Sequence, residues 1–536
     1  MKKKWWHNSV VYQIYPRSFQ DSNGDGIGDL QGIISRLDYL KELGIDLIWL
    51  CPVYASPNDD NGYDISDYYD INPEYGTMDD MEELIAEAKK RGMGIMMDIV
   101  ANHTSDEHPW FIEACNNRDS KYRDFYVFRD GINSTPPNDL GSIFGGSAWQ
   151  YSEEAGQYYL HLFSKKQPDL NWHNPEVRQA MYDVLHFWIN KGIKGFRFDV
   201  IDLIAKEIDN GIIGNGPLLH NYIQEMYDKV LKDADVVTVG EANNADLEQA
   251  LLFSGVDRNE LNMVFSFEHI ALDEVAGKSK WDLRPLELAE LKEVFSKLQH
   301  GLAGKGWNSL FWNNHDQPRI VTRWGNDSKY RYESATSLAT ILHLLQGTPY
   351  IYQGEEIGMT GVQFDTIDDY ADIETLNMYK ERLEKGYSQK EIMESIYAKG
   401  RDNSRTPMQW DSSQQAGFTT ATPWIKVNPN YAEINVENDR HSKRSIFNYY
   451  QKLIELRKQH DIIVNGNYEL LKTSDDIYAY KRVMEDEKWY VVCNFTDKTV
   501  ECNLVEEHVS IILQNYQSPI QSGILRPYEA LVWREK

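Results

Sequence analysis

Short apolar runs typical of buried strands alternate along most of the chain with longer amphipathic stretches. Between most of these runs lie helical patterns such as 30–44 and 81–92, each closing on a glycine that can take the left-handed cap conformation. Eight strands alternating with helices predict an α/β fold, a closed (β/α)8 TIM barrel with a parallel core. The predicted strands are 10–16, 45–53, 94–100, 195–200, 235–241, 263–268, 309–316 and 348–353.

Two regions interrupt this alternation. Residues 104–171 form an aromatic, Asn/Gly-rich stretch that is too long for an ordinary loop, which predicts a small domain inserted after the third strand. After the amphipathic stretch at 443–459 the pattern changes to β runs, which predict a separate antiparallel domain. The predicted organisation is a barrel made of 1–103 and 172–459, an inserted domain at 104–171 and a β-sandwich-like domain at 460–536.

Amino-acid composition and net charge limit the kinds of molecule that this protein can bind. Of the 536 residues, 41% are apolar and 26% are charged, as in a globular protein. The 83 acidic and 55 basic side chains give a net charge of −28, which opposes binding to nucleic acid or to anionic membranes. We find no run of about 18 apolar residues and no signal peptide, and the four cysteines have neither metal-ligand spacing nor a disulfide framework. We expect a monomeric cytoplasmic protein with a neutral small-molecule partner.

Three acidic residues stand where predicted strands end. They are Asp199 in GFRFDV, Glu241 in TVGEANN and Asp316 in FWNNHDQPR. Barrel enzymes place their catalytic side chains at this end of the strands. Arg197 stands two residues before the first acid and His315 beside the third, which favours a catalytic site over isolated helix caps. A buried ion-pair network around Arg197 is the structural alternative.

These motifs resemble, in order, the conserved regions of the α-amylase family of glycoside hydrolases, in particular its oligo-1,6-glucosidase and dextran glucosidase branch. The matching strings are DIVANH at 98–103, GFRFDV, TVGEANN and NNHD, with the additional branch motif QPDLN at 167–171. The resemblance covers essentially the whole chain. It implies an exo-acting retaining α-glucosidase that hydrolyses α-1,6 bonds at the non-reducing end of isomalto-oligosaccharides, panose or dextran and releases α-glucose.

The residue types fit that chemistry. Retaining hydrolysis needs two carboxyl groups about 5–5.5 Å apart, one to attack the anomeric carbon and one to protonate the leaving oxygen. Asp199, held ionised by Arg197, suits the nucleophile, and Glu241 suits the acid/base. Asp316 would accept hydrogen bonds from sugar hydroxyls. Matching positions of the family carry these same roles.

The resemblance also implies a site for one terminal glucose. An Asp60–Arg401 pair would close this site and make the enzyme exo-acting. A valine at 200 accompanies α-1,6 cleavage in this branch, whereas threonine or alanine accompanies α-1,4 cleavage. The run 242–244 after the acid/base departs from many α-1,6-acting relatives. The residues implied to bind substrate are Asp60, Tyr63, His103, Phe163, Arg197, Val200, His315 and Arg401.

The segment DSNGDGIGD at 21–29 alternates oxygen-bearing side chains with glycines. This spacing is typical of calcium loops, although the glutamate of an EF-hand is absent. The resemblance implies a structural Ca²⁺, with no organic cofactor. A metal-free turn is the alternative. The implied ligands are Asp21, Asn23, Asp25, Asp29 and the Ile27 carbonyl.

Other functions share this scaffold. A related α-glucosidase with another linkage preference, such as sucrose or α-1,4 bonds, and a trehalose-6-phosphate hydrolase stay open. Sucrose isomerases carry an arginine-rich motif where this chain has ALDEV at 271–275, which disfavours isomerisation. Non-enzymatic transporter subunits carry a membrane helix and lack catalytic acids, and the sequence departs from them on both counts.

Overall fold

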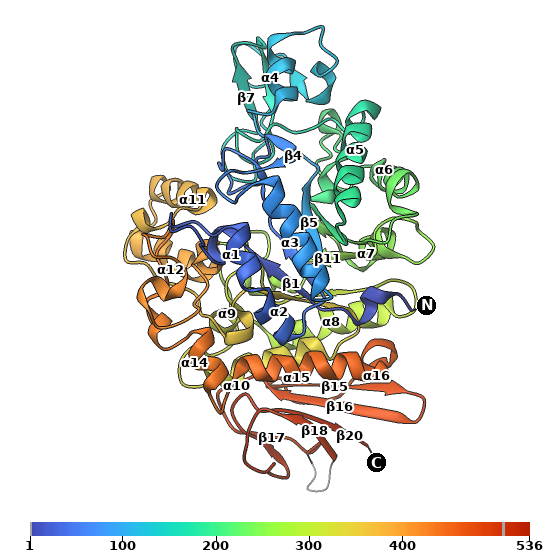
Figure 1. The fold of residues 1–536 in the computed structure, drawn as a ribbon, viewed down its shortest axis with the longest axis vertical. Coiled ribbons are helices and arrows are strands. Elements are labelled where there is room, and N and C mark those ends of the chain that lie inside the picture. The colour runs from blue at the N-terminus through green and yellow to red at the C-terminus, as the bar shows by residue number, and fades with distance from the viewer. Residues whose placement is uncertain (1–2, 506–509, 536) are drawn as a thin grey trace.

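A computed structural model describes residues 3–505 and 510–535, and its centre is a closed parallel barrel (Figure 1). The strands are hydrogen-bonded in the order β11-β10-β9-β5-β2-β1-β13-β12. A parallel bridge between Val264 and Asn308 joins the two ends of this order and closes the barrel. The predicted TIM barrel is confirmed. Its strands are β1 (Val11–Ile14), β2 (Leu47–Leu50), β5 (Gly94–Val100), β9 (Gly195–Asp199), β10 (Val237–Ala242), β11 (Met263–Ser266), β12 (Ser309–Leu310) and β13 (Thr348–Tyr352).

Strand register brings the predicted catalytic residues together. Asp98 on β5 pairs with Arg197 on β9, and Arg197 pairs in turn with Val239 on β10. Because side chains alternate along a strand, Arg197 and Asp199 share one side of β9, while Val239 and Glu241 share one side of β10. Three neighbouring strands therefore carry acids within two residues of their carboxyl ends, at one end of the barrel.

Helices cover the outside of the barrel. The predicted helix at 30–44 is divided into α1 and α2 at Arg36, whose backbone leaves the helical region at φ −108° and ψ 5°. Asp29 caps α1, and Gly44 ends α2 at φ 100°. The helices between barrel strands are α1 (Leu30–Ser35), α2 (Leu37–Leu43), α3 (Met78–Lys90), α5 (Pro175–Lys191), α6 (Leu219–Met226), α7 (Leu247–Ser254), α8 (Leu288–Leu302), α9 (Ile320–Arg323) and α10 (Arg331–His343).

The segment after β5 forms a small antiparallel unit at the top of Figure 1. Its sheet has the order β6-β8-β7, and α4 packs beside it. A bridge from His103 to Asp169 joins the end of the segment to the barrel residue that precedes it, and a bridge from Tyr126 to Leu170 lies within the segment. Its elements are α4 (Pro109–Asn116), β6 (Phe128–Arg129), β7 (Trp149–Ser152) and β8 (Gln157–Leu160), and a hairpin of β3 (Tyr54–Ala55) and β4 (Asp67–Ile71) precedes β5.

The connection after β13 supplies helices near the site and leads into the C-terminal part. The antiparallel C-terminal domain lies at the opposite end of Figure 1 from the inserted segment, with sheets ordered β14-β15-β16-β20-β18 and β17-β19. The remaining elements are α11 (Ile373–Glu384), α12 (Gln389–Lys399), α13 (Asp402–Arg405), α14 (Val436–His441), α15 (Ile446–Gln459), α16 (Asp461–Asn465), β14 (Asn467–Leu470), β15 (Ile477–Met484), β16 (Glu487–Asn494), β17 (Val500–Glu501), β18 (Ser510–Gln514), β19 (Ile524–Leu525) and β20 (Ala530–Arg534).

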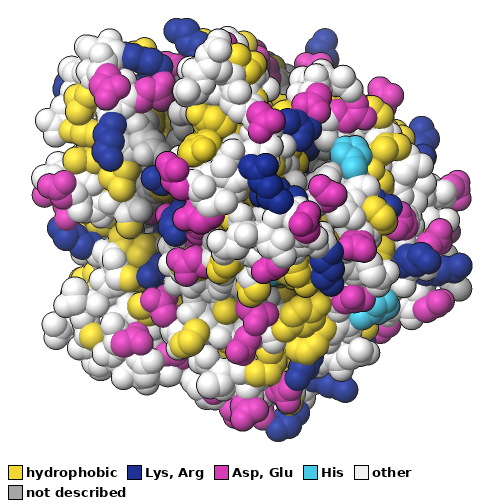
Figure 2. Space-filling model, turned by 90° about the horizontal axis from the view of Figure 1, so that it is seen from above, with side chains coloured by type: hydrophobic (Ala, Val, Ile, Leu, Met, Phe, Trp, Pro, Cys, Tyr) yellow, Lys and Arg dark blue, Asp and Glu magenta, His cyan; other side chains and the backbone are white. Residues whose placement is uncertain are grey.

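Charge on the surface is mixed in sign. On the face shown in Figure 2, acidic side chains lie among lysines and arginines and form no continuous area of one sign. Across 3–505 and 510–535, no helix is both long enough and apolar enough to cross a bilayer.

Candidate active site

One guanidinium group lies at the centre of the site. Arg197 is 1% exposed, and its Nη1 donates to Asp98 Oδ1 at 2.7 Å and to Asp199 Oδ1 at 2.8 Å. Its Nη2 donates to Glu241 Oε2. The nucleophile and acid/base candidates are therefore held by the two ends of one rigid fork. We call Asp98, Asp199 and Glu241 the carboxylate cluster.

Charge in the carboxylate cluster is unbalanced. Burial raises the pKa of Asp98 to about 6 and the pKa of Asp199 well above its usual range, although Arg197 opposes both shifts. One positive charge faces three buried carboxyl groups, so we expect the cluster to keep a shared proton near neutral pH. A retaining glycosidase needs one ionised and one protonated carboxyl at the start of its reaction.

Asp316 lies at the open side of the site, with its side chain 28% exposed. Arg405 Nη2 contacts its Oδ1 at 2.5 Å, Arg401 Nη1 contacts the same oxygen at 3.3 Å, and His315 Nε2 lies 3.2 Å from Oδ2. Burial opposes ionisation of Asp316, but His315 and the two guanidinium groups outweigh it and hold its pKa well below the usual range. Asp316 is therefore an ionised acceptor of hydrogen bonds.

An aromatic wall faces these acids. Tyr63 stacks on His315 with ring centroids 5.3 Å apart and planes 6° apart, and its hydroxyl donates to Asp98 Oδ2 at 3.0 Å. Burial lowers the pKa of His103 to about 4 and of His315 to about 3, so both rings are neutral at pH 7. Phe163 is half-buried, with its ring centroid 5.1 Å from that of His103.

The predicted Asp60–Arg401 pair is present. Arg401 Nη2 contacts Asp60 Oδ1 at 3.2 Å, and burial raises the pKa of Asp60 to about 6 against the effect of Arg401. Arg401 also donates through Nε to Asp372 Oδ1 at 2.8 Å and lies 5.0 Å above the ring of Phe144. Asp372 is fully buried at the start of α11, so the pair depends on a helix outside the barrel.

Val200 has an uncommon backbone conformation. Its φ of 36° and ψ of 47° lie in the left-handed region, where a β-branched residue is strained. Its amide lies 3.4 Å from Glu241 Oε2, and its side chain packs with Leu203 and Ile208. The turn directly after Asp199 is thus held by packing and by Glu241.

Several residues of the site were missed by sequence reasoning. Asp98 and Gln167 lie inside the motifs DIVANH and QPDLN, but the motifs do not show that these side chains contact the site. Asp372 lies in no motif, and the residues around it give no signal of its contact with Arg401. Gln167 is fully buried and donates to Asp60 Oδ2 at 3.3 Å. Lys206, buried beside the site, places its ammonium 2.8 Å from Asn102 Oδ1 and 3.0 Å from Asp169 Oδ2. It fixes the base of the inserted segment to the barrel.

The loop at 21–29 is ordered by its own carboxylates. Asp21 accepts from the amides of Asn23, Gly24 and Gly26, and Asp29 accepts from Gly32 and Ser22. In 3–505 and 510–535, no three His, Cys, Asp or Glu residues converge closely enough to hold a metal. The oxygen donors suit calcium by their chemistry, but an ion would have to replace some of these amide contacts.

Comparison with known proteins agrees with this geometry. The family description "Alpha amylase, catalytic domain" matches residues 13–466. The chain belongs to the α-amylase family. Oligo-1,6-glucosidase of Bacillus cereus is 56% identical, with 100% of both chains covered, and glucan 1,6-alpha-glucosidase of Streptococcus pneumoniae is 54% identical, with 99% of each covered. The crystal structure of a mutant trehalose-6-phosphate hydrolase from Bacillus licheniformis is 47% identical with a TM-score of 0.95, covering 99% of this chain and 100% of that one.

This α-amylase family chain buries one further acid close to Asp199 and Glu241. Asp202, on the short helix η4 (Ile201–Leu203), is 1% exposed, and neither carboxyl oxygen has a hydrogen-bond partner within the described ranges. Burial raises its pKa to about 7, and the charge of Glu241 adds to the shift. A buried carboxylate without a partner destabilises the fold once it ionises.

We expect Asp202→Asn to flatten the pH dependence of stability. Because the pKa of Asp202 is raised on folding, its stability contribution is fully present below about pH 4 and is lost as pH rises through about 7. The free energy of unfolding of the variant, relative to the parent, should therefore rise by on the order of 1–4 kcal/mol between pH 4 and 8. Urea unfolding at both pH values measures it. A constant difference between the two proteins would contradict this expectation.

Proposed function

We propose that the chain is an exo-acting, retaining α-glucosidase that cleaves α-1,6-glucosidic bonds at non-reducing ends and releases α-glucose. The observation that supports it most is the shared guanidinium, with Asp199 on one end and Glu241 on the other. The relatives named oligo-1,6-glucosidase and glucan 1,6-alpha-glucosidase support the linkage. Isomaltose, panose and dextran are the proposed substrates.

In the first step, an Asp199 oxygen attacks the anomeric carbon while Glu241 protonates the glycosidic oxygen of the departing aglycone. Arg197 keeps the attacking oxygen oriented through its 2.8 Å hydrogen bond. The product of this step is a glucosyl ester on Asp199 and a free aglycone alcohol.

In the second step, Glu241 takes a proton from water, and the resulting nucleophile attacks the ester from the side that the aglycone left. Two inversions give net retention. Asp316, ionised and 28% exposed, accepts hydrogen bonds from ring hydroxyls that strengthen as the sugar distorts. The neutral imidazoles of His103 and His315 can each bind a hydroxyl without adding charge.

The Asp60–Arg401 contact supports the exo assignment, since it closes the site beyond the first sugar. A trehalose-6-phosphate hydrolase is the second candidate, because a solved relative of that name is 47% identical over nearly the whole chain. A glucose-release assay on isomaltose, panose, dextran, maltose, sucrose and trehalose 6-phosphate separates these possibilities.

We expect Asp199→Asn or Glu241→Gln to lower hydrolysis of isomaltose by at least a thousandfold, because each removes one half of the double displacement. Asp202→Asn is the matched control, a carboxyl-to-amide change three residues from the nucleophile that should keep the activity. Proton NMR of the parent enzyme should show α-glucose first. Initial β-glucose, or normal activity in either variant, would refute the mechanism.

We expect Val200→Thr to raise kcat/KM on maltose relative to isomaltose. The change in this ratio should correspond to about 1–3 kcal/mol, which is the usual effect of a methyl-sized change in a binding site. Threonine is also β-branched, so the strained turn at φ 36° should change little. Val200→Ile, which keeps the apolar character, is the control. An unchanged ratio of the two specificity constants in Val200→Thr would place linkage choice elsewhere.

A structural Ca²⁺ at 21–29 is also proposed, held by Asp21, Asn23, Asp25, Asp29 and the Ile27 carbonyl. The support is chemical, since the loop offers carboxylate, amide and carbonyl oxygens, which are the ligands that Ca²⁺ takes. An ion that binds only the folded state stabilises it by mass action, so Tm should rise with free calcium while chelation leaves low-temperature activity unchanged. Asp25→Ala should abolish the calcium dependence of Tm. A Tm indifferent to calcium and chelator would leave the loop an ordinary turn.

We further place the enzyme in the cytoplasm as a monomer. All four cysteines are free and buried, which suits a reducing compartment. Sedimentation of the purified chain measures the oligomeric state.

A further inference from the structure

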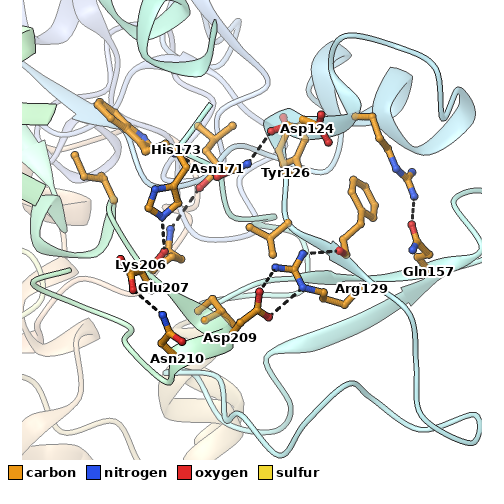
Figure 3. A pocket seen from close by; sticks show the side chains of 17 residues that line it. Asp124, Tyr126, Arg129, Gln157, Asn171, His173, Lys206, Glu207, Asp209 and Asn210 are labelled. Carbon is orange, nitrogen blue, oxygen red and sulfur yellow. Dashed lines mark hydrogen bonds and ion pairs between the residues drawn. The ribbon is translucent and has the colours of Figure 1, made fainter. Parts of the chain in front are cut away.

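A second polar pocket, which we call the side pocket, lies between the inserted segment and the loop after β9 (Figure 3). Its volume is about 400 Å³, within the range of about 300–1,000 Å³ typical of small-molecule sites. One wall comes from the inserted segment and carries Asp124, Phe128 and Arg129; the other carries Glu207 and Asn210.

The side pocket is separate from the active site. Neither Asp199, Glu241 nor Asp316 lines it. Lys206 stands between the two, with its ammonium turned to Asn102 and Asp169 and its backbone carbonyl bonded to His173 on the pocket side. A ligand in the side pocket would therefore not meet the reacting atoms.

Charges around the side pocket cancel. Arg129 pairs with Asp209 at 2.7 Å across the two walls, and Lys206 is neutralised by Asp169 at 3.0 Å behind the wall. Because the whole chain carries a net charge of −28, an anion is also repelled at long range. These charges favour a neutral ligand.

Hydrogen-bonding groups nevertheless converge on the opening (Figure 3). One carboxylate oxygen of Glu207 accepts a hydrogen bond from the Asn210 side-chain amide at 2.8 Å. Within the described residues, the carboxylate of Asp124 makes no hydrogen bond or ion pair. Both carboxylates thus keep acceptor capacity. Arg129 donates through Nε and Nη2 to Asp209 and through Nη1 to the Phe128 carbonyl, which leaves one further N–H on each of Nη1 and Nη2. Val127 and Phe128, both half-buried, give the same pocket apolar surface, and the buried side chains of Leu170, Trp172 and Ile204 lie at its base.

A neutral molecule with hydroxyls at its edge and C–H groups on its faces matches this combination. We propose that the side pocket binds a glucosyl unit, either free glucose or the end of an isomalto-oligosaccharide. The ligand would bridge the inserted segment and the loop after Val200, since Ile208 at the pocket rim packs in the same apolar cluster as Val200. The choice of sugar rests on the proposed glucosidase function.

Equilibrium dialysis of Asp199→Asn, which cannot consume substrate, tests the proposal with radiolabelled glucose and, separately, isomaltotriose. We expect two moles of sugar per chain at saturation, one in the active site and one in the side pocket. Removing the bridging pair with Arg129→Ala and Asp209→Ala should leave one mole. Asn210→Trp, which fills the side pocket from an exposed position, should do the same.

The matched control removes a comparable exposed ion pair elsewhere. Lys194 and Asp235 are 2.7 Å apart with side chains 43% and 70% exposed, against 41% and 71% for Arg129 and Asp209. Lys194→Ala with Asp235→Ala should keep two moles. One mole in Asp199→Asn itself, or two moles in both side-pocket variants, would overturn the proposal. Loss of the mole bound in the active site would instead count against the glucosidase assignment. If the side pocket binds glucose alone, its ligand is the product; if it binds isomaltotriose alone, its ligand is the end of an oligosaccharide.

Discussion

The site depends on a single buried guanidinium that is shared by three carboxyl groups. Arg197 is almost fully enclosed, and an arginine stays charged even there, so it fixes Asp98, Asp199 and Glu241 at set positions around one planar fork. Removing Arg197 would leave these carboxyl groups buried without a counter-charge, which is costly. The arrangement makes the site rigid and, because three carboxyl groups share one positive charge, favours retention of a proton that acid/base chemistry can use.

A second group of charges extends this order outward. Arg401 and Arg405 hold Asp316, and Arg401 also reaches Asp60 and Asp372. These contacts join the barrel to the helices that follow β13, so in the proposed enzyme the position of the first sugar would depend on chain segments far apart in sequence. A site closed at this end would favour cleavage at chain termini.

Much of the fold was predictable because barrel strands and helices have strong periodic signals. Seven of the eight barrel strands lie within the predicted apolar runs, and β10 ends at Ala242, one residue beyond the predicted 235–241. β12 is only Ser309–Leu310 where 309–316 was predicted. After Leu310 the backbone is no longer hydrogen-bonded as a barrel strand, and this part of the chain holds Asn314, His315 and Asp316. The predicted helix at 30–44 is broken at Arg36, which pattern alone did not reveal.

The alternation of elements, the three acids near strand ends and the resemblance to a known family can all be read from the amino-acid order, since they depend on residues close together along the chain. Which charged groups meet is set by the folded structure. The sharing of Arg197 by three acids, the anchoring of Arg401 by Asp372 and the isolation of Asp202 all require contacts between distant segments. Register and burial, which no local pattern encodes, set those contacts and the pKa values that follow from them.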